Sequence, residues 1–158
     1  MHIVLPPRLE SASAMPVVSV TRLHLASIRA FPGFLRYSLA SSRQARRSPG
    51  FIAGWLSTDS EWAFWTSTVW TTAEAMRAFR NSGTHMKAMP KLLHWCDEAS
   101  YTHWDQADPV APGVDAAYER LAREGKLSKV NAPSPRQMAG QTVGRVKPRV
   151  GQGLAPRT

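Results

Sequence analysis

Histidine is the residue type in this sequence best suited to acid–base or ligand chemistry near neutral pH, and His85 is the strongest candidate. It follows Gly83 and is expected to open a short helix beside an apolar cavity. A neutral imidazole in that place can ligate a heme iron or carry a proton. The alternative is a polar residue at a helix start that bonds a neighbouring carbonyl group.

His94 and His103 are weaker candidates, and we expect structural roles for both. Neither falls in a His-x-x-x-His or helical Glu-x-x-His spacing, so no metal centre built from side chains is expected. Cys96 is the only cysteine, which excludes an internal disulfide. No basic helix-terminal setting surrounds it, so we expect an inert thiol.

Arg22 and Trp70 complete the set of candidate catalytic residues. An arginine within a strand needs an anionic partner, and the options are a heme propionate, a substrate oxygen or Asp105 on a neighbouring strand. Trp70 belongs to an aromatic group that either lines a pocket for a flat substrate or fills the core. Core packing is the default for that group, which comprises Trp55, Trp65, Trp70, Phe64 and Tyr101.

Composition indicates one globular domain without a membrane span. The 158 residues are 43% hydrophobic and 20% charged, and no apolar run approaches the length of a spanning helix. Of the net charge of +9, residues 126–158 carry seven basic side chains and no acidic one. The basicity is therefore attributed to the tail, and no specific nucleic-acid partner is expected. We also expect a cytoplasmic location.

The two ends of the chain are predicted to lie outside the domain, which spans residues 15–130. Residues 1–14 are either a disordered leader or an upstream extension before a true start at Met15. Residues 131–158 are rich in proline and glycine and carry few apolar side chains, so we expect a basic, disordered tail.

Hydrophobic periodicity predicts an α+β domain with the order β-α-β-β-α(α)-β. The expected strands cover 17–24, 51–58, 62–70 and 99–106, and the expected helices cover about 32–47, 72–82, 84–95 and 115–123. This order is the ferredoxin-like split β-α-β arrangement with a four-stranded antiparallel sheet. The strand at 62–70 is apolar on both faces, so the face without helices is predicted to close a dimeric α/β barrel around a small apolar molecule.

Several segments resemble the dimeric α/β-barrel superfamily, which includes antibiotic-biosynthesis and heme-degrading monooxygenases. The resemblance is strongest to spheroidene monooxygenase and its uncharacterised relatives, and it covers about residues 17–134. It rests on the segments Phe64–Trp70 (FWTSTVW), Glu74–Phe79 (EAMRAF), Ser82–Met86 (SGTHM) and Gly125–Ser134 (GKLSKVNAPS).

The resemblance implies a small monooxygenase-like homodimer acting on an apolar substrate, with oxygen chemistry from a heme or from a substrate carbanion. Heme degraders of this superfamily place their proximal histidine on the helix that holds His85. Alignment on Trp70 puts Met89 at that position, with His85 one turn earlier. Either residue is thus a candidate ligand. The competing hypothesis is a non-catalytic ligand-binding or stress-associated protein of the same fold.

Overall fold

The structure, a computed structural model, describes residues 15–158 and arranges them around one antiparallel sheet. The sheet has the order β5-β4-β1-β3-β2-β6. Its long strands are β1 (Val17–Leu25), β2 (Phe51–Thr58), β3 (Ala63–Trp70) and β4 (Cys96–Asp105), and its short ones are β5 (Lys126–Leu127) and β6 (Gln152–Leu154). The prediction of four strands is therefore corrected to six, because segments after β4 add a strand to each edge.

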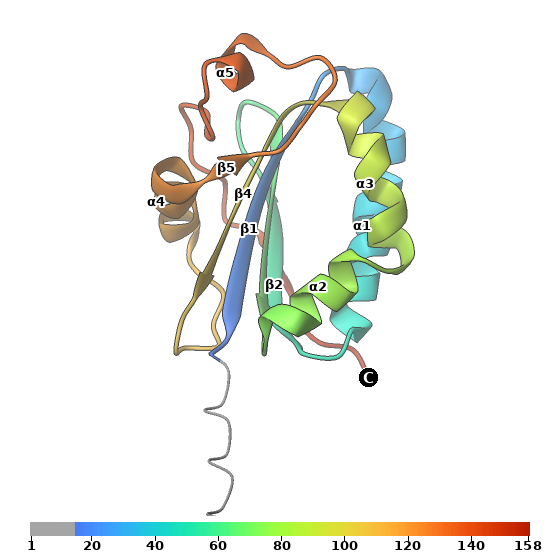
Figure 1. Cartoon of the computed structure of the whole chain (residues 1–158), viewed down its shortest axis with the longest axis vertical. Helices are drawn as coiled ribbons and strands as arrows, with labels where there is room; N and C mark the ends of the chain where they lie inside the picture. The colour runs from blue at the N-terminus through green and yellow to red at the C-terminus, as the bar shows by residue number, and fades with distance from the viewer. Residues whose placement is uncertain (1–14) are drawn as a thin grey trace, which may run out of the picture.

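Helices cover both faces of the sheet (Figure 1). One face carries α1 (Phe31–Arg47), preceded by a 3-10 turn (η1, Ile28–Ala30), together with α2 (Ala73–Arg80) and α3 (Gly83–Trp95). We call α1, α2 and α3, with η1, the helical layer. The other face carries α4 (Val114–Glu124), and α5 (Pro135–Met138) lies near one end of the sheet. The order from β1 to β4 confirms the predicted ferredoxin-like arrangement.

Local sequence signals explain where the helices begin and end. Pro32 lies in the first turn of α1, and Arg46 and Arg47 lie in its last turn, where they favour the negative end of the helix dipole. Thr72 caps α2 by accepting a hydrogen bond from the backbone N–H of Ala75 at 3.0 Å. Pro90 lies within α3, which runs as one helix from Gly83 to Trp95.

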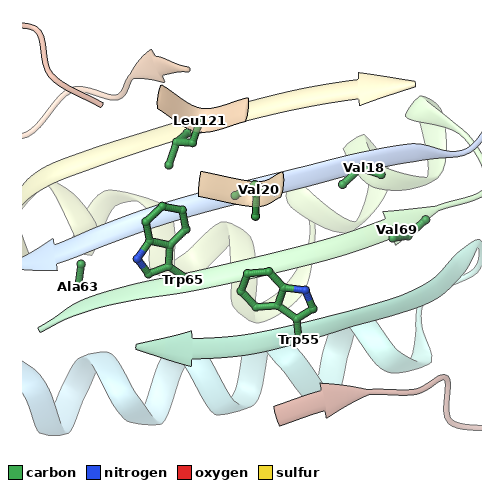
Figure 2. Close-up of a cluster of buried hydrophobic side chains, with 8 residues drawn as sticks. Val18, Val20, Trp55, Ala63, Trp65, Val69 and Leu121 are labelled. Atoms are coloured by element: carbon green, nitrogen blue, oxygen red, sulfur yellow. The ribbon is translucent and has the colours of Figure 1, made fainter. Parts of the chain in front are cut away.

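The sheet face opposite the helical layer is not bare, which corrects the prediction of an uncovered apolar face. Side chains from β1, β2 and β3 form a buried core with Ala117 and Leu121 of α4, and Figure 2 shows these side chains gathered on the sheet. The sheet contributes Val18, Val20, Trp55, Ala63, Trp65 and Val69. Apolarity on both faces of β3 is thus satisfied within the chain itself.

The C-terminal segment has a defined path, in contrast to the predicted disordered tail over 131–158. The hydroxyl of Tyr118 donates to the carbonyl of Gly144 at 2.7 Å, and the hydroxyl of Ser100 donates to the carbonyl of Thr142 at 2.6 Å. Further along, β6 pairs with β2. These bonds fix the segment through its backbone, so it needs few apolar side chains to stay in place.

The predicted leader, residues 1–14, lies outside the described residues. Within residues 15–158, no helix has both the length and the apolar character needed to cross a bilayer.

Candidate functional site

The sheet face beneath the helical layer carries a band of polar side chains. Val17 of β1 and Trp70 of β3 pack against residues of α1 and α2. Because successive side chains of a strand point to opposite faces, the residues two and four positions from Val17 and from Trp70 lie on the same face of the sheet. Two cross-strand rows result: Tyr101, Thr21 and Thr66 in one, and His103, Ser19 and Thr68 in the next. All of these side chains except Thr68 are only half-buried, so solvent reaches this polar band.

A cleft of about 370 Å³ opens where this polar band of the sheet meets α2. The sheet contributes Val17, His103, Trp104 and Asp105, and α2 contributes Ala73, Met76, Arg77 and Arg80. The lining thus combines apolar surface with one imidazole, one carboxylate and two guanidinium groups. Two guanidinium groups beside an imidazole can hold a molecule that carries or develops negative charge.

His103 is the titratable side chain of the cleft best placed for proton transfer. Burial lowers its pKa, and the positive charges of Arg80 and Lys126 lower it further. The imidazole is therefore neutral at neutral pH and able to accept a proton. Its ring lies 5.3 Å from the ring of Tyr101, centroid to centroid, which helps to fix its orientation.

His85, the strongest sequence candidate, supports the cleft rather than lining it. Its Nδ1 lies 3.2 Å from the carbonyl oxygen of Arg80, and its ring packs 4.7 Å from that of Phe79. Its backbone N–H donates to Oε1 of Gln44 at 2.9 Å, so the start of α3 is tied to α1. Burial is the main cause that lowers the His85 pKa. The expected alternative, a helix-start histidine against a neighbouring carbonyl, describes this geometry.

Gly83 makes this junction between α2 and α3 possible. Its backbone has φ of +57°, a left-handed conformation that glycine adopts without steric cost. A Cβ at this position would lie 2.9 Å from the side-chain amide carbon of Gln44. The amide nitrogen of that side chain donates to the carbonyl of Ser82 at 2.8 Å, so the turn that sets Arg80 beside the cleft is held from two sides.

The residues proposed for heme do not converge on a common space. Met89 is exposed on the outer side of α3, and neither it nor His85 lines the cleft. Trp70 is fully buried, donates its Nε1–H to the hydroxyl of Thr68 at 3.0 Å and stacks on Phe79 at 5.0 Å. These side chains therefore do not fit a heme site, and Trp70 is a core residue beneath the cleft.

Arg22 lies on the opposite face of the sheet, within a buried ionic cluster. Its Nη1 donates to Oε2 of Glu98 at 2.6 Å, and its Nε lies 4.0 Å from Oδ2 of Asp59. The anionic partner is thus Glu98 rather than Asp105. Asp59 also accepts from Trp65 Nε1 at 2.9 Å. With the sheet between Arg22 and the cleft, its role is structural.

Sequence reasoning did not single out Arg80 and expected a structural role for His103, whereas the structure places both side chains on the lining of the cleft. Arg80 follows an ordinary helical pattern, and only the fold shows that it borders a cleft. The alternation of Tyr101 with His103 did signal one shared face of β4, but the strand register was needed to bring that face next to Thr21 and α2. Among residues 15–158, no three His, Cys, Asp or Glu side chains gather as a metal site.

Comparison with known protein families places this cleft in context. A family model described as antibiotic biosynthesis monooxygenase matches residues 17–91, which run from β1 into α3. The chain therefore contains an antibiotic-biosynthesis-monooxygenase-like domain, of which residues 17–91 match the family model. His103 lies beyond the matched residues, whereas Arg77, Arg80 and His85 lie within them. A comparison with curated proteins finds no match.

Solved structures share the fold of the monooxygenase-like domain. A variant of SnoaB, a cofactor-independent oxygenase from Streptomyces nogalater, is 18% identical with a TM-score of 0.51, covering 60% of this chain and 96% of its own. A conserved protein from Methanosarcina mazei is 12% identical with a TM-score of 0.53, covering 60% and 95%. An antibiotic biosynthesis monooxygenase candidate from Nitrosomonas europaea is 11% identical with a TM-score of 0.52, covering 63% and 97%. More than a third of this chain lies outside each match.

Proposed function

We propose that the monooxygenase-like domain oxygenates a small, largely apolar substrate in the cleft between α2 and β4, without a bound cofactor. The observation that carries this proposal is the meeting of His103, whose pKa is lowered, with Arg77 and Arg80 in one cleft of about 370 Å³. The likeness to SnoaB, itself a cofactor-independent oxygenase, supports the same reaction class. The lack of convergence between His85 and Met89 favours it over a heme-dependent reaction.

The cleft supplies the chemistry that such a reaction needs. Neutral His103 takes a proton from an acidified CH₂ group of the substrate, and the guanidinium groups of Arg77 and Arg80 stabilise the resulting anion. That anion passes electrons directly to O₂, and a C–O bond forms. Loss of water then leaves a carbonyl group, so that CH₂ and O₂ become C=O and H₂O. His85 and Trp70 act as positioning residues that hold Arg80 and the wall behind it.

Oxygen consumption tests the proposal directly. The intact protein is given polycyclic ketones with a CH₂ group between aromatic rings, and O₂ uptake is followed with an electrode. We expect His103→Gln to lower kcat by about 100-fold or more, the usual contribution of a general base. His94→Gln is the matched control, since His94 is exposed on α3 and bonded to Asn131 at 2.9 Å. Unchanged uptake in His103→Gln would contradict the assignment.

The competing function, non-catalytic ligand binding, gives a different result in the same experiment. Quenching of tryptophan fluorescence by the ketone, without O₂ uptake, would indicate a binding protein. Homodimerisation and a cytoplasmic location also stay predictions. Because α4 covers the expected interface, a dimer would use another surface, such as the outer edge of β4 beyond Tyr101, where the pairing with β5 ends.

A further inference from the structure

The helical layer is strongly basic. Residues 28–47 and 73–95 contain nine basic side chains and one acidic one, Glu74, which gives a net charge of +8, while residues 126–158 add +7 and the rest of the chain carries −6. The basic residues are Arg29, Arg36, Arg43, Arg46, Arg47, Arg77, Arg80, Lys87 and Lys91. Within residues 15–158, none of these nine side chains forms a salt bridge.

The same layer exposes large apolar side chains. Leu35 and Leu39, one turn apart on α1, are about two-fifths exposed, and Met86 and Met89 on α3 are about half exposed. Ile28, in η1 just before α1, is 87% exposed. On α1, the exposed Arg36, Arg43 and Arg47 have spacings of seven and four residues and therefore share one face.

The two helices present these residues on one continuous surface. The rings of Tyr37 on α1 and Trp95 on α3 lie 5.7 Å apart, and Lys91 of α3 lies 5.3 Å from the centroid of the Tyr37 ring. Figure 1 shows α1 and α3 side by side on the outer side of the molecule, away from the sheet. Basic and apolar side chains therefore alternate across a surface formed by neighbouring helices.

We propose that the outer surface of the helical layer binds an anionic membrane. Basic side chains attract the surface of acidic lipids, while leucine, isoleucine and methionine gain by entering the boundary between headgroups and acyl chains. A nucleic acid would satisfy the charge but not the apolar side chains, because phosphate contacts are made by polar and basic groups. The anionic lipid surface matches both properties. This binding does not depend on the reaction proposed above.

Co-sedimentation with vesicles tests the proposal on the full chain. We expect binding to vesicles of phosphatidylcholine and phosphatidylserine in equal parts, and little binding to vesicles of phosphatidylcholine alone. The variant Arg36→Gln/Arg43→Gln/Arg47→Gln should weaken binding by about 100-fold, at about fivefold for each basic side chain at the surface. The matched control, Arg123→Gln/Lys129→Gln/Arg145→Gln, removes three exposed charges outside the helical layer and should bind like the parent.

A second variant separates a membrane from a nucleic acid. Leu39→Asn/Met89→Asn keeps every charge, and we expect it to lose at least tenfold in vesicle binding, because two side chains no longer enter the bilayer boundary. Failure of the parent to bind the acidic vesicles, or equal losses in both triple variants, would overturn the proposal. The proposal would also be overturned if Leu39→Asn/Met89→Asn bound the acidic vesicles as well as the parent does and the parent bound duplex RNA as tightly as it binds these vesicles.

Discussion

Replacement of Arg22 by methionine is expected to lower the free energy of unfolding by about 3–5 kcal/mol. Arg22 is 1% exposed, and its side chain compensates Glu98, which is nearly as buried, across a contact of 2.6 Å. Methionine fills similar volume but leaves the Glu98 carboxylate without its main cation. A pair of charges about 4 Å apart at an effective dielectric of 20 is worth about 4 kcal/mol, which agrees with that range. The loss is a large part of the stability of a typical domain.

The loss of stability in Arg22→Met is expected to depend on pH in a defined direction. Burial by itself raises the pKa of Glu98, but hydrogen bonds from Arg22 and Ser134 and the charges of Arg22 and Arg136 bring it below its usual value. In the parent protein, the stabilisation that comes from the ionised Glu98 carboxylate is present at pH values above the usual glutamate pKa. It is lost as the pH falls through the lowered pKa that Glu98 has in the folded state. In Arg22→Met, burial dominates and raises the Glu98 pKa. The deficit relative to the parent should therefore shrink as the pH falls from neutral into the acid range.

Urea unfolding at neutral and acid pH measures both effects. The double variant Arg22→Met/Glu98→Gln should recover only part of the loss, because the Glu98 side chain is then neutral, whereas the buried Asp59 carboxylate still lacks Arg22. Arg123→Met is the control, since Arg123 pairs with Glu124 at 3.4 Å on the exposed side of α4 and should change stability by less than about 1 kcal/mol. A cost for Arg22→Met as small as that of the control would refute the reasoning.

Three further outcomes follow from single contacts. Arg80→Gln removes a positive charge that lowers the pKa of His103, so the acid limb of the O₂-uptake profile should move to higher pH. Gly144→Ala would drive a Cβ into the Glu61 carboxylate, and we expect a loss of about 1–3 kcal/mol in thermal or urea unfolding. Burial, with a smaller effect of the Asp97 charge, raises the pKa of the Cys96 thiol to about 12, so a thiol reagent should label the protein only after unfolding, and prompt labelling would contradict this burial.

The central architecture was predictable because its signals are local. Val17–Leu25 is rich in β-branched and apolar residues, and the apolar faces of α1 and α4 repeat at helical spacing, so the element types followed from the residues alone. The start of β3 was placed one residue early. Trp62 has φ of +64° and is 72% exposed, so it belongs to the turn, and no pattern of apolar residues reveals that conformation.

The cleft was less predictable because its parts come from separate elements. Placing His103 beside Ser19 requires the register between β1 and β4, and placing Arg80 beside both requires the turn that Gln44 holds. The charge of the helical layer was hidden for a similar reason. When the charge is averaged over residues 1–125, the basic side chains of the helical layer are offset by acidic ones elsewhere. Examples are Asp59 in the hairpin between β2 and β3, Asp105 in β4 and Asp115 in α4.

The prediction of a bare sheet face shows what a hydrophobic pattern does and does not specify. Two-sided apolarity in β3 requires that both faces be removed from water, because burial of apolar area is favourable whatever covers it. The pattern carries no information on whether the cover is a second copy or a later segment of the same chain. Here α4 supplies apolar side chains, while the segment around Gly144 is held through its carbonyl group by the hydroxyl of Tyr118, a contact that leaves no periodic pattern in the sequence. The cleft in which half-buried polar side chains meet the two arginines of α2 lies on the other side of the sheet, beneath the helical layer.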